Sequence, residues 1–204
     1  MTAHRIVIAG TGTEVGKTWT AARLLEHARA NGITVAARKP AQSYERGDAV
    51  TDAHLLAAAS GETPEQVCPP HRWYPTPMAP PMAADALGKE PITLDQLLRE
   101  TPWPDAQLSL IETAGGLCSP IAHDGDNLAL IRRLEPTRVI LVADAGLGTL
   151  NSVRLCLHAL GEIPTTVFLN RFDANVDLHR RNREWLRRGD VDAVVSVEDI
   201  GGRF

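Results

Sequence analysis

One short segment of the chain combines the residue types that bind phosphate: Gly10-Thr11-Gly12-Thr13-Glu14-Val15-Gly16-Lys17-Thr18. Glycines let backbone N–H groups converge on phosphate oxygens, and the N-terminus of a following helix adds a favourable dipole. Lys17 would contact the β- and γ-phosphates, and the Thr18 hydroxyl would hold Mg²⁺. Five residues separate Gly10 from Gly16, one more than usual, but the segment follows a strand-like run and opens a helical pattern. The sequence therefore predicts a nucleotide-binding protein rather than a simple glycine-rich turn.

Other polar residues follow strand-like runs, where open α/β sheets bind ligands. Lys39 comes directly after the second run, although a solvated lysine is the alternative. Asp52 begins a helical pattern, so it either caps the helix or binds a ligand. Glu112 and Asp144 each end an apolar run, and from the residues alone either one could complete Mg²⁺ coordination. Asn170 opens a segment that vaguely resembles the base-reading motif of GTPases, and a turn cap explains it nearly as well.

The elements that must position these residues alternate along the chain. Strand-like runs cover Arg5–Ala9, Ile33–Ala37, Leu108–Ile111, Val139–Ala143, Thr165–Leu169 and Ala193–Ser196. Helical patterns cover Lys17–Asn31, Asp52–Ser60, Asn127–Leu134, Leu150–Leu160 and Leu178–Arg188. Such alternation indicates βαβ units. We therefore expect an α/β, P-loop NTPase-like three-layer fold, with a mostly parallel sheet flanked by helices.

The middle of the chain breaks this pattern, because ten of its 14 prolines fall between Pro64 and Pro104. We expect two short helices there, Met82–Leu87 and Leu94–Glu100, and an ordered loop around Cys68–Pro81. Because the stretch also contains Trp and Tyr, it is typical of an insertion at one edge of the sheet rather than of a linker. The prediction is one domain, residues 1–204.

Composition excludes several classes of protein. The 204 residues are 44% hydrophobic, which supports a real core, and the net charge of −4 argues against nucleic acid or an anionic membrane as partner. No apolar run has the ~20 residues of a membrane span, and no signal peptide is recognisable. Three cysteines without CxxC spacing predict reduced thiols in the cytoplasm. The arginines between 180 and 188 indicate a solvated helix face, with Trp185 and Leu186 packing inward.

Taken together, these residues resemble the dethiobiotin synthetase family over about the first 170 positions. The loop ending Thr13-Glu14-Val15-Gly16-Lys17-Thr18, with its extra residue, is similar to that family's own P-loop. Further similar segments are Lys39-Pro40 with Ser43, the acidic Asp52, Glu112-Thr113-Ala114-Gly115-Gly116, Tyr74-Pro75 with Met78-Ala79-Pro80, and Leu147-Gly148-Thr149-Leu150-Asn151.

The resemblance implies a reaction in biotin biosynthesis. In this family of ligases 7,8-diaminononanoate takes up CO₂ as a carbamate, ATP phosphorylates the carbamate, and the second amine closes a cyclic urea, giving dethiobiotin, ADP and phosphate. ATP and Mg²⁺ are implied as cofactors and a homodimer as the assembly. Because the substrates supply both nucleophile and electrophile, the protein mainly positions them and neutralises charge.

The resemblance also assigns roles to residues, and it settles the choice between the two acids in favour of Glu112. The implied catalytic residues are Lys17, Lys39, Thr13 and Ser43. The implied nucleotide-binding residues are Thr13, Glu14, Val15, Gly16, Lys17, Thr18 and Asn170. The implied magnesium ligands are Thr18, Asp52 and Glu112. Ser43 would contact the substrate, and Gly148, Thr149, Leu150 and Asn151 would hold its carboxylate across the dimer interface.

Two departures from the family pattern keep other functions open. Thr113 stands where the family has glycine, which matters if that position has φ > 0. The segment Val197–Phe204 is shorter than the family's base-binding segment, which predicts weak base selectivity. The alternatives are a divergent P-loop ATPase or small-metabolite kinase, and a nucleotide-binding relative without catalysis. A ParA/MinD-like switch ranks low, because Gly12 stands where that family has a lysine.

Overall fold

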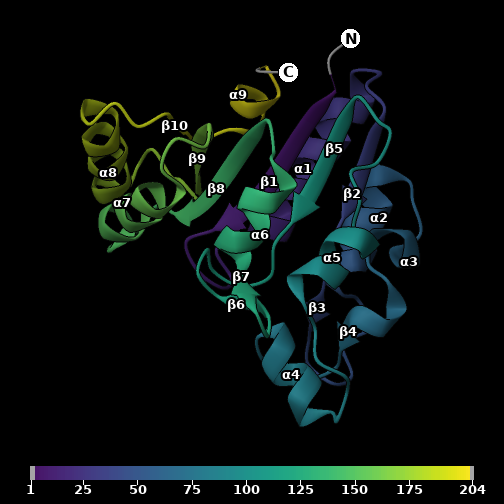
Figure 1. Cartoon of the computed structure of the whole chain (residues 1–204). Helices are drawn as coiled ribbons and strands as arrows, with labels where there is room; N and C mark the ends of the chain where they lie inside the picture. Colours follow the sequence, from purple (N-terminus) through teal and green to yellow (C-terminus); the bar gives the residue numbers. More distant parts are fainter. Residues whose placement is uncertain (1–2, 203–204) are drawn as a thin grey trace.

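A six-stranded parallel sheet forms the centre of the computed structural model, which describes residues 3–202 (Figure 1). Its strands are β1 (His4–Gly10), β2 (Val35–Arg38), β5 (Leu108–Glu112), β8 (Arg138–Asp144), β9 (Thr165–Asn170) and β10 (Ala193–Val194). They lie in the order β10-β9-β8-β1-β5-β2, and all neighbouring pairs are parallel. The residues that follow β1, β2, β5 and β9 therefore meet at one edge of the sheet.

Helices cover both faces of the sheet, which confirms the predicted three-layer α/β fold. One face packs against α1 (Lys17–Ala30), α2 (Asp52–Ser60), α3 (Pro64–Val67) and α9 (Val197–Gly201). The other face carries α5 (Leu94–Glu100), α6 (Asn127–Leu134), α7 (Thr149–Leu160) and α8 (Asp177–Arg188), while α4 (Pro80–Ala86) lies beyond the carboxyl ends of the strands. In Figure 1, β5 and β8 point toward the lower part of the view, where α4 and the small strands lie.

Local sequence signals set the ends of the two helices nearest the carboxyl edge. Gly16 precedes α1 with φ +95, a left-handed conformation that glycine adopts without strain. Thr51 is the N-cap of α2, and its N–H donates to His54 Nδ1 at 3.2 Å. The reading of Asp52 as a helix cap is therefore wrong, and its carboxylate is available for other contacts.

The largest differences from the expected elements lie outside the main sheet. β2 begins at Val35 rather than Ile33, because the Ile33 N–H donates to Ala28 O and closes the end of α1. Two small sheets were not predicted: β3 (Gln42–Ser43) pairs with β4 (Trp73–Tyr74), and β6 (Pro120–Ala122) pairs with β7 (Gly125–Asp126). The predicted loop around 68–81 also contains a 3₁₀ turn, η1 (Pro70–Arg72). Strands of two or three residues have no recognisable periodicity, which explains the omission.

Further expectations concern the last helices and the surface. Leu186 of α8 is buried as expected, but Trp185 is 58% exposed, so its predicted inward packing is wrong. Within 197–204 the structure places α9, and residues 203–204 lie outside the described part. Between residues 3 and 202, no helix is long and apolar enough to cross a membrane. Cys68, Cys118 and Cys156 are free.

Candidate active site

A cavity of about 800 Å³ opens at the carboxyl edge of the sheet. Its wall comes from the glycine loop, the segment after β2, the start of α2, the loop before α4 and the segment after β5. The predicted site residues that line it are Thr13, Glu14, Gly16, Lys17, Thr18, Lys39, Ser43, Asp52 and Glu112. Segments separated by up to about a hundred positions therefore meet in one place, and both predicted lysines lie in the same cavity.

The glycine loop turns from β1 into α1 around the Lys17 ammonium. Lys17 Nζ donates to Gly12 O at 3.1 Å across the loop. Burial lowers the pKa of Lys17, and the nearby Glu112 carboxylate partly opposes this effect. Backbone N–H groups of the first turn of α1 have no partner within the helix, so the loop can bind an anion.

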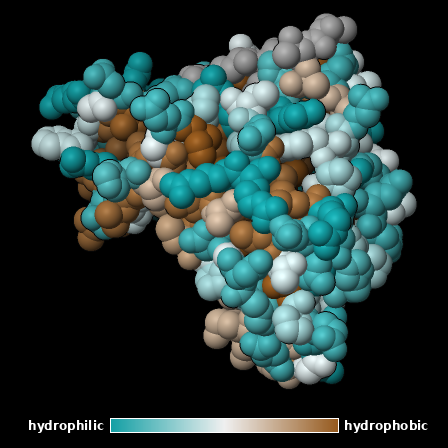
Figure 2. Space-filling model, viewed as in Figure 1, coloured by the Kyte–Doolittle hydropathy of each residue, from teal (hydrophilic) through white to brown (hydrophobic). Residues whose placement is uncertain are grey.

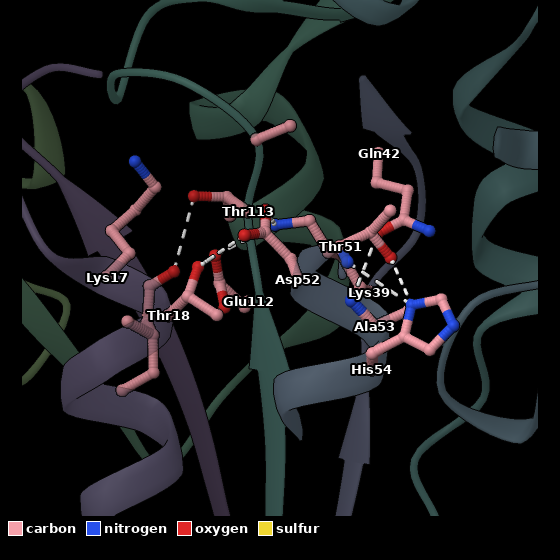
Figure 3. Close-up of polar contacts among 12 residues, drawn as sticks. Lys17, Thr18, Lys39, Gln42, Thr51, Asp52, Ala53, His54, Glu112 and Thr113 are labelled. Atoms are coloured by element: carbon pink, nitrogen blue, oxygen red, sulfur yellow. Dashed lines mark hydrogen bonds and ion pairs between the residues drawn. The ribbon is translucent and has the colours of Figure 1, made fainter. Parts of the chain in front are cut away.

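Three oxygen-bearing side chains converge beside this loop (Figure 3). Thr18 Oγ1 lies 3.0 Å from Asp52 Oδ1 and 2.8 Å from Glu112 Oε1. Thr18 lies in the first turn of α1, Asp52 begins α2, and Glu112 ends β5, which lies next to β1 in the sheet. The parallel pairing of β1 with β5 thus brings the carboxylate of Glu112 to the loop.

Lys39 joins the two carboxylates. Its ammonium lies 2.8 Å from both Asp52 Oδ2 and Glu112 Oε1, and its side chain is only 2% exposed. Burial alone would lower the pKa of Lys39, but the two carboxylates raise it above its ordinary value. Burial alone would raise the pKa of Asp52, but the Lys39 ammonium lowers it below its ordinary value. Lys39 is therefore held as a cation, not as the solvated surface lysine of the alternative interpretation.

The same cluster fits a magnesium ion. Glu112 is fully buried, and its Oε2 makes no hydrogen bond to the described residues 3–202. Burial raises the pKa of Glu112, with a contribution from the Asp52 charge, so an additional cation would stabilise its ionised form. Two carboxylates and a hydroxyl are the hard oxygen donors that Mg²⁺ prefers.

Asp144, the competing acid, lies elsewhere. Its Oδ2 accepts from Arg171 at 3.2 Å and its Oδ1 accepts from the Gly146 N–H at 2.7 Å. Asp144 ends β8, on the other side of β1 from β5, and it is absent from the cavity wall. Of the two acids that the strand pattern left open, only Glu112 meets Thr18.

The segment after Glu112 accommodates a threonine where glycine was expected. The Thr113 N–H and Oγ1 both donate to Ile8 O, at 3.0 and 3.2 Å, so the side chain is turned toward β1. The left-handed conformation falls instead on Gly115, with φ +75. Thr113 therefore has no positive φ, and the threonine in place of the family's glycine causes no backbone strain.

Sequence reasoning missed several residues that position the site. Asn127 Nδ2 donates to Ala114 O and Gly116 O, and so holds the glycine segment after β5. Gln42 Oε1 accepts from the Ala53 N–H and fixes the start of α2. Both are buried polar side chains at the ends of elements, a signal that needs knowledge of burial.

Other predicted residues lie apart from the cavity wall. Asn170 Nδ2 donates to Val15 O at 2.9 Å, and a Cβ on Gly16 would lie 1.9 Å from that amide nitrogen. Asn170 therefore supports the loop from β9 and packs where only a glycine fits. Gly148, Thr149, Leu150 and Asn151 form the first turn of α7 and its N-cap, outside the lining of this cavity.

Comparisons with known proteins agree with this geometry. A family model described as an AAA domain matches residues 4–191. The chain is 40% identical over 157 residues to an ATP-dependent dethiobiotin synthetase from Mycolicibacterium vanbaalenii, and 38% over 161 residues to one from Caulobacter vibrioides. The matches cover 76% of this chain and 68% and 73% of those proteins. A third, from Streptomyces coelicolor, is 37% identical, and 65% of it is covered, just under two thirds of its length.

Solved structures share the fold at much lower identity. A plasmid partition protein from Borrelia burgdorferi gives a TM-score of 0.53 at 14% identity, covering 91% of this chain and 86% of that one. The chloroplast FtsY from Physcomitrella patens also gives 0.53, at 16% identity, covering 98% and 61%. These likenesses concern the fold alone, whereas the sequence relatives decide the family: this chain belongs to the ATP-dependent dethiobiotin synthetases.

Proposed function

We propose that this protein converts 7,8-diaminononanoate, CO₂ and ATP into dethiobiotin, ADP and phosphate. One amine of the substrate adds to CO₂ and forms a carbamate. A carbamate oxygen attacks the γ-phosphorus and displaces ADP. The second amine then attacks the carbamate carbon, loses its proton, and expels phosphate together with that oxygen, which closes the cyclic urea.

The observation that carries the proposal is the pair of lysines in one cavity. Lys17 would bind the phosphate chain from the loop, and Lys39 would bind oxygens of the carbamate and the transferred phosphoryl group. Two ammonium groups at fixed positions stabilise charge where it develops, without reorganisation during the reaction. Thr13 and Ser43 would add hydroxyl donors, and Ser43 supports this role because its buried Oγ has no partner among the described residues.

Magnesium is the proposed metal, held by Thr18, Asp52 and Glu112. When bound, Mg²⁺ neutralises charge on the β- and γ-phosphates. The chain's own part is the Lys39 ammonium, which lies 2.8 Å from each carboxylate and favours their ionised forms. Nucleotide contacts are proposed for the six loop residues Thr13, Glu14, Val15, Gly16, Lys17 and Thr18, and base contact for Asn170.

A homodimer is the proposed assembly. Gly148, Thr149, Leu150 and Asn151 lie outside the cavity wall, so in this account they hold the substrate carboxylate in the cavity of a second copy. Leu147 is 92% exposed and Leu155 is 62% exposed beside them, and Figure 2 shows hydrophobic surface where α7 and α8 lie. Exposed apolar side chains gathered in this way favour association. The cytoplasm is the proposed compartment, in line with three free cysteines.

The test is substrate-dependent release of ADP and phosphate from Mg-ATP. We expect turnover only when diamine and bicarbonate are both present, and dethiobiotin formed in equal amount to ADP. Omission of the diamine is the critical control. Equal ATP hydrolysis without diamine would favour an ATPase switch and reject the proposal, and so would an absence of diamine-dependent phosphate release.

A further inference from the structure

Trp19 is an exposed aromatic residue on the wall of the active-site cavity. It follows Thr18 directly in α1, is 49% exposed, and lines the same cavity as Lys17 and Lys39. Nothing in the proposed chemistry uses it. Single exposed apolar side chains are common, but Trp19 lies in the wall of the cavity that holds both lysines, where a bound ligand would meet its ring.

The ring of Trp19 is held in place. Phe168 of β9 stacks against it with ring centroids 6.5 Å apart and an interplanar angle of 19°. The guanidinium of Arg23, one turn further along α1, lies 5.9 Å from the ring centroid and is paired with Glu26. A supported aromatic ring loses little conformational entropy on binding, which suits a stacking surface.

The order of the strands indicates which part of a bound nucleotide would lie against the Trp19 ring. Lys39, Asp52 and Glu112 gather on the β5 and β2 side of the loop, where the proposed phosphoryl transfer takes place. Trp19 contacts β9, on the opposite side of β1. A nucleotide whose γ-phosphate lies at the carboxylates must extend its nucleoside the other way.

Arg171 supports this direction. It follows β9 and lines the cavity, while its guanidinium donates to Glu14 O at 2.9 Å and to Asp144 at 3.2 Å. Planar cationic and aromatic groups are the surfaces on which nucleobases stack.

We propose that the exposed part of Trp19 is the stacking surface for the base of the bound nucleotide and sets its preference for purines. The inference rests on the proposed nucleotide site and adds a residue that determines which base is accepted. Stacking depends on the area of the π-system, so a purine gains more from this ring than a pyrimidine does.

The test compares a ligand that has a base with one that has none. Calorimetry would measure the binding of Mg-ATP, Mg-CTP and Mg-tripolyphosphate to the wild-type protein and to Trp19→Ala, Trp19→Phe and Trp185→Ala. We expect Trp19→Ala to weaken ATP binding roughly tenfold and CTP binding less, with tripolyphosphate unchanged within about twofold. Trp19→Phe should keep most of the affinity. Trp185→Ala, an exposed tryptophan outside the cavity, should change nothing.

Equal losses for ATP and tripolyphosphate in Trp19→Ala would overturn the inference, because Trp19 would then only shape the loop. An unchanged ATP affinity would overturn it as well. Diamine and bicarbonate are absent from these measurements, so a failure of ring closure and a failure of base stacking are separate results.

Discussion

The two ends of the cavity hold charge in different ways. At one end Lys39 and Glu112 are almost fully buried and bonded to each other, with Asp52 and Thr18 completing the cluster. At the other end Trp19 is 49% exposed and the Arg171 side chain is 60% exposed, and Arg171 is anchored by Glu14 O and by the half-exposed Asp144. The first end is part of the folded core, and the second end lies at the protein surface.

Function and stability are therefore coupled at the buried end of the cavity. A charge removed from the buried cluster leaves an opposite charge without a partner in a low dielectric, which harms both chemistry and folding. A side chain removed from the exposed end should cost less stability, because exposed ion pairs such as that of Arg171 contribute little to folding. Substitutions at the two ends should therefore be distinguishable.

The largest effect is expected at Lys39. Lys39→Met should reduce the rate of ring closure by roughly 10²–10³-fold, because one charged donor to the transferring group is lost. Steady-state kinetics with diamine and bicarbonate would measure it, and Mg-ATP affinity should stay within about threefold. If nucleotide affinity fell as steeply as the rate, Lys39 would belong to the nucleotide site instead.

A smaller effect is expected from the proposed metal ligands. Asp52→Asn should raise the Mg²⁺ concentration needed for half-maximal activity by about tenfold, since one anionic oxygen donor is replaced by a neutral one. Titration of activity with Mg²⁺ would show it. Asp144→Asn is the matched control and should leave the titration unchanged. If Asp144→Asn raised the required Mg²⁺ concentration as much as Asp52→Asn, Asp52 would not be a specific metal ligand.

The pH dependence of stability tests the buried cluster independently of catalysis. Lys39 lowers the pKa of Asp52, and that stabilisation is present above the ordinary carboxyl pKa and lost only as pH falls through the lowered value. The pKa of Lys39 is raised, so its contribution is complete below pH 10.5 and lost as pH rises through the folded value. Both contributions are therefore present at neutral pH.

Lys39→Met removes the ammonium and leaves Glu112 and Asp52 with raised pKa values, so ionising them costs stability as pH rises. The free energy of unfolding should fall below that of the wild type by about 3 kcal/mol near pH 8 and by less near pH 5. Urea denaturation at both pH values would measure the difference in the free energy of unfolding between the variant and the wild type. Lys89→Met is the control, because the Lys89 ammonium donates to the backbone carbonyls of His71 and Trp73 and takes no part in the buried carboxylate cluster. A stability difference between Lys39→Met and the wild type that becomes smaller toward pH 8 would contradict the proposed role of the Lys39 charge.

The smallest effect is expected on the β9 side. Asn170→Ala removes the hydrogen bond to Val15 O and should lower the free energy of unfolding by about 1 kcal/mol. If the amide only supports the loop, ATP and GTP should lose affinity equally. A change in the preference between these two nucleotides would instead support the proposed base contact.

The same two ends differ in how far the sequence predicts them. Continuous apolar runs such as Leu108–Ile111 and Val139–Ala143 predict their strands, and the glycine loop predicts phosphate binding. The choice between Glu112 and Asp144 does not follow from the residues, because both end such a run. Strand order decides it: β5 lies between β1 and β2, and β8 lies on the other side of β1.

Trp19 shows a second difference between pattern and packing. On a helix of 3.6 residues per turn it lies on the side away from Leu24, Leu25 and Ala28, which are buried against the sheet, so its exposure follows from the helical pattern. That its ring stacks on Phe168 and lines the cavity depends on where β9 lies in the sheet, which the pattern of one helix does not give.

The path of one oxygen atom distinguishes phosphorylation of a carbamate from hydrolysis of ATP. Turnover would be started with freshly dissolved ¹⁸O-labelled CO₂ in unlabelled water, quenched within the time of oxygen exchange, and the phosphate analysed by mass spectrometry. If the carbamate is phosphorylated in this cavity, label from CO₂ appears in the phosphate, at up to one ¹⁸O per molecule. Phosphate that carries no ¹⁸O from CO₂ would mean that water attacks ATP, and would contradict the account.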